Sequence, residues 1–343
     1  MAFLFCDSFD HLATAQLPSK WNSVLGGANI GAAGGRNGTN SLRLDGNETI
    51  TKQLSPSGST CIIGFARKPG SAVNLTGPFL AIGDATVTHI TIAMNADLTW
   101  NVARGGVLNN TLGTSLGDTS AAHTLDQYDY WEVKVIIHNS AGVVDIKKNG
   151  VSVLALMGID TQNGGTAGWT NFALAAATNT NLADYDDLYV LDGTGSAPHN
   201  DCYGDVRIAA HFPTADGTTT DATPSTGSDH YAVVDEAAAN SDTDYNTVTA
   251  VGDKDTLELT DLIPTGAAIL AFQTVIFAKK SDAGVGVVCP VLRYSGTDYD
   301  GDDHALSTAY ACAVQPYENN PGTGIQMTEA EFNALEVGYK RTA

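Results

Sequence analysis

Apolar and polar residues alternate along most of the chain, as in strands that place one face on a core. Gly, Asn and Asp interrupt the alternation at short intervals and mark turns, and helical periodicity is nearly absent. The polar stretch 214–229 is predicted to be a long loop. Strands are predicted at residues 60–66, 79–82, 89–94, 99–104, 130–138, 143–148, 151–156, 256–259, 268–279, 285–294 and 309–314.

The stretch from Trp131 onward predicts three adjacent strands. Trp131, Val133 and Val135 alternate with polar residues, so one face of this strand, with the indole of Trp131, is expected in the core. Residues 139–142 form a first turn that leads back along the strand. Asn149-Gly150 suits a second turn with two left-handed backbone positions, after which a third strand continues.

The chain divides near its middle, where residues 193–200 (GTGSAPHN) break the strand pattern. This predicts two domains, residues 1–196 and 197–343. In the second domain, Thr328 and Glu331 form a capping box that predicts one short helix near the C-terminus. The extended segment 336–340 is then expected to complete a sheet. The predicted fold class is all-β, with two β-sandwich domains in tandem.

Acidic residues dominate the charge of the chain, whose formal net charge is −21. Residues 200–343 carry 22 acidic and 7 basic side chains, which leaves about −15 in that half. A surface of this sign repels phosphate backbones and anionic lipids, so binding to nucleic acid or to a membrane surface is not expected. The N-terminus lacks the basic region of a secretory signal. The 5 cysteines are scattered without a C-x-x-C pair, which fits a chain folded in a reducing cytoplasm.

The order of WEVKVII (131–137), GVVDIKKNG (142–150) and DDLYVLD (186–192) resembles a concanavalin A-like, laminin-G-type jelly roll. The opening FCDSF (5–9) and the SLRL segment (41–44) fit the first strands of such domains. The resemblance covers roughly residues 1–195. It implies a fold and names no ligand.

Most of residues 198–343 resembles a module of bacteriophage virion and minor tail proteins. The resemblance rests on several segments in order: GDVR (204–207), PSTGSDHY (224–231), VGDKDT (251–256) and the closing TEAEFNALEVGYK (328–340). It implies a structural component of a tail, baseplate or fibre, located in a virion assembled in the host cytoplasm. The expected partners are other virion proteins and further copies of the chain.

Two alternatives to this structural role remain open within the same architecture: a protein that decorates the capsid, and an adhesin that binds glycans on the host surface. A glycan-degrading enzyme is not expected, because jelly-roll hydrolases need paired carboxylates on one strand and Glu132 stands alone on its own. The sequence also lacks G-x-S-x-G and H-E-x-x-H motifs. The chain is therefore predicted not to be an enzyme.

Three groups of residues are candidate sites. Asp298, Asp300 and Asp302 alternate as oxygen ligands do in a calcium loop, although a solvated turn between strands is the favoured explanation and no other cofactor is indicated. Asp186 and Asp187 precede the last predicted strand of the first domain and are candidates for ligand or partner contact. Trp169 lies in a loop-like setting, where its ring needs a cover from its own domain, a partner protein or a glycan.

Overall fold

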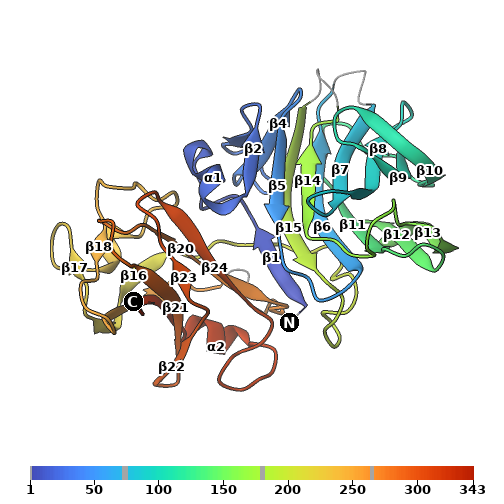
Figure 1. Cartoon of the computed structure of the whole chain (residues 1–343). Coiled ribbons are helices and arrows are strands. Elements are labelled where there is room, and N and C mark those ends of the chain that lie inside the picture. Colours follow the sequence, from blue (N-terminus) through green and yellow to red (C-terminus); the bar gives the residue numbers. More distant parts are fainter. Residues whose placement is uncertain (1, 72–75, 178–181, 263–265) are drawn as a thin grey trace. The chain divides into compact units, whose positions relative to one another are not determined.

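The computed structural model describes residues 2–71, 76–177, 182–262 and 266–343, and it groups the chain into two compact units (Figure 1). The first unit contains residues 1–10 and 21–208, and the second contains residues 11–20 and 209–343. These units are groups of residues in contact, whereas the predicted boundary between residues 196 and 197 separates domains. That domain boundary stays a prediction.

The first unit contains an antiparallel eight-stranded sheet. β1 (Phe3–Asp7) pairs with β15 beside the main path of this sheet. The path runs β13 (Val151–Ile159), β12 (Gly142–Lys148), β11 (Asp129–Ile136), β6 (Thr60–Pro69), β15 (Leu182–Leu191), β4 (Ser41–Asp45) and β3 (Asn29–Gly31).

A seven-stranded antiparallel sheet completes the first unit. Its order is β10 (Thr111–Asp118), β9 (Trp100–Val107), β8 (Thr88–Met94), β7 (Gly77–Gly83), β14 (Asn171–Ala175), β5 (Thr49–Gln53) and β2 (Ser23–Leu25). Side chains from both sheets meet in the core between them, where the rings of Trp131 and Trp100 stack with centroids 3.7 Å apart. The expectation of a core position for Trp131 is confirmed, since its side chain is fully buried.

The predicted strands of the first unit are confirmed, including the run β11–β12–β13. Asn149 and Gly150 have φ angles of 49° and 79°, so the Asn-Gly turn adopts the two left-handed positions predicted for it. The short helix α1 (Leu17–Lys20) was not predicted, because four residues carry no detectable periodicity. No helix among the described residues is long and apolar enough to cross a membrane.

The second unit is also antiparallel. One sheet has the order β16 (Pro213–Thr220), β19 (Lys254–Leu259), β25 (Glu336–Arg341), β21 (Val287–Tyr294) and β22 (Thr297–Asp300), with β23 (His304–Ala305) on β21. Two further pairs are β17 (Thr223–Pro224) with β18 (Asn246–Thr247), and β20 (Phe272–Ala278) with β24 (Ala311–Tyr317).

The C-terminal predictions for the second unit are also confirmed. Helix α2 (Glu329–Asn333) begins with the capping box, in which Thr328 N donates to Glu331 Oε2 (2.8 Å) and Glu331 N to Thr328 Oγ1 (3.3 Å). The segment after the helix forms β25, which lies between β19 and β21 in the sheet. The described part of the chain is therefore all-β, as predicted, with α2 as the predicted short helix and α1 as one that was not predicted.

The prediction of one long loop over residues 214–229 is wrong. Residues 213–220 form β16, which pairs with β19 at the edge of the sheet. An edge strand has one neighbour and solvent on its other side, so it does not need the apolar alternation by which strands are found in a sequence. Threonine is also well suited to a strand.

Candidate functional site

Polar side chains gather on the face of the eight-stranded sheet that points away from the seven-stranded sheet, here called the outer face. Because side chains alternate along a strand, Tyr130 and Glu132 lie on the outer face when Trp131 lies in the core. Both are nonetheless buried, with 1% and 0% of their surface exposed. They are covered by loop 32–40 and by the chain that follows β15.

A β-bulge in β15 places two carboxyl groups side by side on this face. The register of β15 against β6 shifts between Asp186 and Tyr189, and Asp187 has a φ angle of 50°, which is uncommon for a residue with a Cβ. Bulges re-aim side chains and are frequent next to functional sites. Here the bulge turns both Asp186 and Asp187 toward Arg36.

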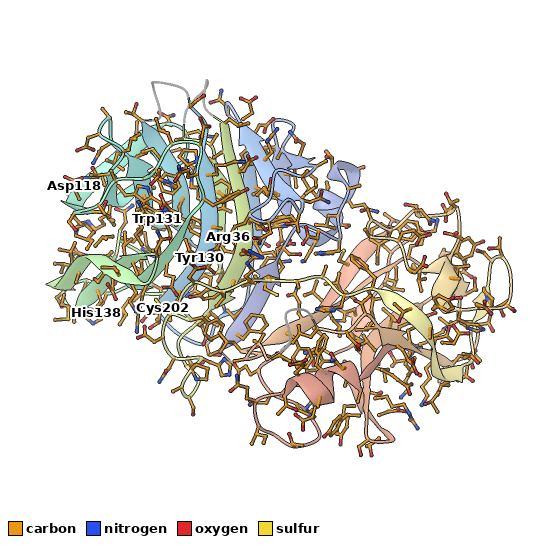
Figure 2. All side chains as sticks on the ribbon, turned by 180° about the vertical axis from the view of Figure 1, so that it is seen from behind. Arg36, Asp118, Tyr130, Trp131, His138 and Cys202 are labelled. Carbon is orange, nitrogen blue, oxygen red and sulfur yellow. The ribbon has the colours of Figure 1, made fainter. Side chains whose placement is uncertain are left out.

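Arg36 and loop 32–40 bind this pair of carboxyl groups. The backbone N–H of Arg36 donates to Asp186 Oδ2 (2.7 Å), and its guanidinium Nη1 donates to Asp187 Oδ2 (3.3 Å). Figure 2 shows Arg36 beside Tyr130, and the guanidinium carbon lies 5.2 Å from the centre of that ring. A Cβ on Gly35 would lie 2.8 Å from Asp186 Oδ2 and 2.3 Å from Asn40 O within the loop, so glycine at this position allows the loop to approach Asp186 this closely.

The proton affinity of the pair is strongly perturbed. Burial, followed by the charge of Asp187, raises the pKa of Asp186 from 3.8 to about 7. Burial also raises the pKa of Asp187, although hydrogen bonds from Ile208 N and from Arg36 oppose the rise. Two adjacent carboxyl groups cannot both ionise cheaply away from water. The pair therefore retains a proton close to neutral pH, where a carboxyl group can donate as well as accept a hydrogen bond.

A second group on the outer face, here called the Arg43 cluster, consists of Arg43, Lys68, Asp184 and Tyr128. The guanidinium of Arg43 donates two hydrogen bonds to Asp184, from Nε to Oδ1 (2.8 Å) and from Nη2 to Oδ2 (3.1 Å). Lys68 Nζ lies 3.1 Å from the same carboxylate, and 5.0 Å from the centre of the Tyr128 ring. Two cations thus share one carboxylate, and one positive charge is left over among the groups in direct contact.

The Arg43 cluster is accessible from solvent on its cationic side only. The side chain of Asp184 is fully buried, whereas 36% of the Arg43 side chain and 26% of the Lys68 side chain are exposed. The hydrogen bond to Asp184 raises the pKa of the Arg43 guanidinium, so Arg43 keeps its charge at any ordinary pH. Both Lys68 Nζ (3.2 Å) and Tyr128 OH (2.7 Å) donate to Gly34 O, which fixes their positions.

The other sequence candidates lie apart from this face. Trp169 is 2% exposed and its indole N–H donates to Thr60 O (2.8 Å), so its own domain covers the ring. The carboxylate of Asp300 forms an ion pair with Lys340 (2.6 Å). The backbone N–H of Asp302 donates a hydrogen bond to Gln315 Oε1 (2.7 Å).

Asp298, the remaining member of the calcium candidate, is held by two basic side chains, Arg293 at 2.6 Å and Lys254. Within the described ranges, no three His, Cys, Asp or Glu side chains are grouped so that they could hold a metal ion. The three aspartates are thus not brought together, and calcium binding there stays a prediction.

Sequence reasoning identified Asp186 and Asp187 but missed the residues that accompany them. Arg36 stands as the single cation in the glycine-rich segment 34–38. A lone arginine among glycines is the feature of the sequence by which Arg36 could have been found. The contact of Arg43 and Lys68 with one carboxylate leaves no signal in the sequence, because it depends on the position of β15 between β4 and β6.

The second unit contains a hollow of about 450 Å³. Its carboxylates already have partners: Glu336 accepts hydrogen bonds from Thr218 N (2.8 Å) and Thr256 Oγ1 (2.5 Å), and Glu331 belongs to the capping box. This leaves little unsatisfied hydrogen-bonding capacity for a ligand. Its lining comprises Thr218, Arg293, Tyr294, Ser295, Gly296, Ala330, Glu331, Ala334 and Glu336.

The first unit is thus a β-sandwich with a polar, partly cationic outer face. No protein-family profile matches the chain, and no curated protein matches it. Among solved structures it resembles the alginate lyase Aly36B, with 14% identity, 55% of this chain and 96% of that chain covered, and a TM-score of 0.40. It also resembles Trypanosoma rangeli sialidase, with 11% identity, 48% and 27% coverage and a TM-score of 0.32.

A third similar structure is domain 4 of AbnA, an arabinanase of Geobacillus stearothermophilus, in complex with arabinotriose. It has 16% identity, 49% and 76% coverage and a TM-score of 0.32. At these sequence identities and TM-scores, the likeness describes a β-sandwich compatible with a jelly roll, and it assigns no activity.

Two expectations are corrected by these comparisons. The structures found are an alginate lyase, a sialidase and an arabinanase domain in complex with arabinotriose, so the comparisons contradict the interpretation as a phage structural protein. The same comparisons contradict the expectation that the chain is not an enzyme, while they assign no activity to it. The virion location and the homo-oligomeric state stay predictions that the comparisons do not address.

Proposed function

We propose that the first unit is a concanavalin A-like jelly roll that binds an acidic glycan at the Arg43 cluster on its outer face. The observation that carries this proposal is the sharing of Asp184 by Arg43 and Lys68, which gives one cation more than the carboxylates in direct contact, with Asp45 as a further acid whose charge acts on Arg43. In a chain with a net charge of −21, an accessible excess of positive charge is a specific place for an anion.

The neighbouring groups favour a sugar carboxylate over a simple inorganic anion. A guanidinium can bind a carboxylate through two parallel hydrogen bonds, and the exposed side of Arg43 has donors beyond those used by Asp184. Tyr128 adds an aromatic ring with a polar tip next to Lys68. Cations and a ring within one patch match the carboxylate and the apolar ring face of a uronic acid.

The proposal is tested by titration calorimetry with an alginate tetrasaccharide as the anionic probe and a neutral oligosaccharide as its counterpart. Arg43→Ala should weaken binding of the anionic probe at least about tenfold, as expected for loss of a charged hydrogen bond. Arg104→Ala is the matched control, because Arg104 is a half-exposed arginine paired with Asp160 at a strand of the seven-stranded sheet. It should bind like the wild type.

Two results would contradict the proposal: wild-type protein that binds neither probe, and binding that is equally lost in both arginine variants. Because sugar-acting enzymes share this fold class, each mixture is also assayed for shortened products after incubation. Raising the salt concentration should weaken binding of the anionic probe, since salt screens contacts between exposed charges.

A further inference from the structure

The chain that follows β15 crosses the outer face as an extended segment. Residues 201–206, here called the covering segment, have no strand partner among the described residues and are half exposed or exposed. Figure 2 labels Cys202 within it, and Tyr130 and Arg36 on the face that it crosses. Three hydrogen bonds hold it to the face. Lys134 Nζ donates to Asp201 Oδ1 (3.0 Å), Gly204 N–H donates to Glu132 Oε1 (2.7 Å), and Arg36 Nη1 donates to Val206 O (3.1 Å).

Beneath the covering segment lies an aromatic surface. The ring of Tyr189 lies against Gly64 of β6, where a Cβ would approach within 2.1 Å of the ring carbon Cε1. The ring can lie flat on the sheet only because residue 64 is a glycine. The ring of Tyr203, in the covering segment, packs against this ring at a tilt, with centroids 4.8 Å apart and planes 37° apart. Flat, sheet-mounted aromatic rings of this kind can stack against the apolar face of a sugar.

The polar groups around the ring are also bound by the covering segment. Tyr189 OH donates to Glu132 Oε1 (2.6 Å) and accepts from the backbone N–H of Tyr203 (2.9 Å). Gly204 N–H donates to the same Glu132 oxygen (2.7 Å). The second oxygen, Oε2, is buried and has no hydrogen-bond partner among the described residues. A fully buried carboxylate with an unused oxygen is costly to stability, and such groups are concentrated at functional positions.

We propose that Tyr189 and Glu132 form a second sugar-binding position, four residues further along β6 from Lys68 of the Arg43 cluster, and that the covering segment occupies it as a displaceable substitute for the glycan. Tyr203 takes the place of a stacked sugar ring, and the N–H groups of Tyr203 and Gly204 take the place of sugar hydroxyls. This inference rests on the proposed function of the outer face. It adds that a glycan long enough to extend beyond the Arg43 cluster must lift the segment.

The alternative is that the covering segment is a permanent part of the fold and that Glu132 only fastens it. The two accounts differ in what a bound glycan does to the segment. Displacement breaks the hydrogen bonds of the Tyr203 and Gly204 amides, whereas a permanent segment keeps them. The amides therefore report on the second position independently of whether the Arg43 cluster binds.

The experiment is amide hydrogen exchange of the whole wild-type chain, without ligand and with saturating alginate tetrasaccharide. We expect exchange of the Tyr203 and Gly204 amides to rise at least about tenfold with the ligand, because bonds that protect amides are replaced. Bound ligand with unchanged or slower exchange of these amides would overturn the displacement proposal and leave the proposed function intact. Absence of any binding in calorimetry would instead contradict the proposed function, and this proposal with it.

A variant gives a second measurement. Tyr203→Ala removes the stacked ring and should tighten tetrasaccharide binding about tenfold, because the ligand no longer competes with the segment. Tyr203→Phe keeps the ring on Tyr189 and is the matched control, expected within about twofold of the wild type. Glu132→Gln in the Tyr203→Ala background should remove most of the gain. Equal affinity of Tyr203→Ala and wild type would overturn the proposal.

Discussion

The buried carboxyl pair predicts an unusual dependence of stability on pH. The pKa of Asp186 is raised to about 7 in the folded protein, against 3.8 for the ordinary group. The folded state therefore retains a proton that the unfolded chain loses at lower pH, and the free energy of unfolding contributed by Asp186 falls as pH rises toward neutrality. Once pH passes the folded pKa, the fold holds an ionised carboxylate that is 2% exposed.

The size of this effect follows from the pKa difference. One unit is worth about 1.4 kcal/mol, so the rise to about 7 amounts to about 4 kcal/mol in total. Most of the total, about 3 kcal/mol, is lost between about pH 5 and about pH 8. Replacing Asp186 by Asn removes the titration while keeping the shape of the side chain. It also relieves Asp187 of a neighbouring charge, which changes stability in the same direction.

The assay is urea unfolding of wild type and Asp186→Asn at about pH 5 and about pH 8. At each pH the difference between the two proteins cancels the titration of the shared groups other than Asp187, whose pKa depends on the charge of Asp186. The difference should shift by about 3 kcal/mol in favour of the variant at the higher pH. A difference that stays constant within about 1 kcal/mol would refute the account of the buried pair, whatever the absolute stabilities.

Two further predictions test the interior of the first unit. Burial lowers the pKa of His123 to about 4, so the fold holds it neutral and loses stability as pH falls from about 6.5 toward 4. His123→Gln should flatten this acid limb of the urea-unfolding profile, and an unchanged slope would contradict a buried neutral histidine. Gly64→Ala should lower stability by about 1–3 kcal/mol, because its Cβ would meet the Tyr189 ring. The control Gly168→Ala, where a Cβ would have open space, should unfold like the wild type, and equal losses in both variants would contradict the close packing.

The fold was predictable where one face of a strand is buried. Trp131 and Val133 alternate with polar residues because β11 has a core on one side, and the Asn149-Gly150 turn follows from local backbone preferences. Strand β16 was missed because its position at an edge relaxes the requirement for apolar side chains. Local rules therefore recover central strands and turns better than edges.

The site was only half predictable, for a different physical reason. Asp186 and Asp187 are adjacent in sequence, so they could be singled out without a structure. Arg43 and Lys68 meet only because β4 and β6 both pair with β15, a long-range arrangement that no local pattern encodes. For Trp169, the loop-like neighbourhood left open whether its own domain, a partner or a glycan covers the ring, and the fold provides Thr60 as the partner of its indole N–H.

We expect the outer face to bind an acidic glycan, and a crystal structure of the chain with an alginate tetrasaccharide will show whether it does. We predict a sugar carboxylate in contact with Arg43 and Lys68, and another sugar of the same tetrasaccharide on the ring of Tyr189 in place of Tyr203. A tetrasaccharide bound instead in the hollow beside Arg293 and Glu331, with the outer face unoccupied, would contradict the claim.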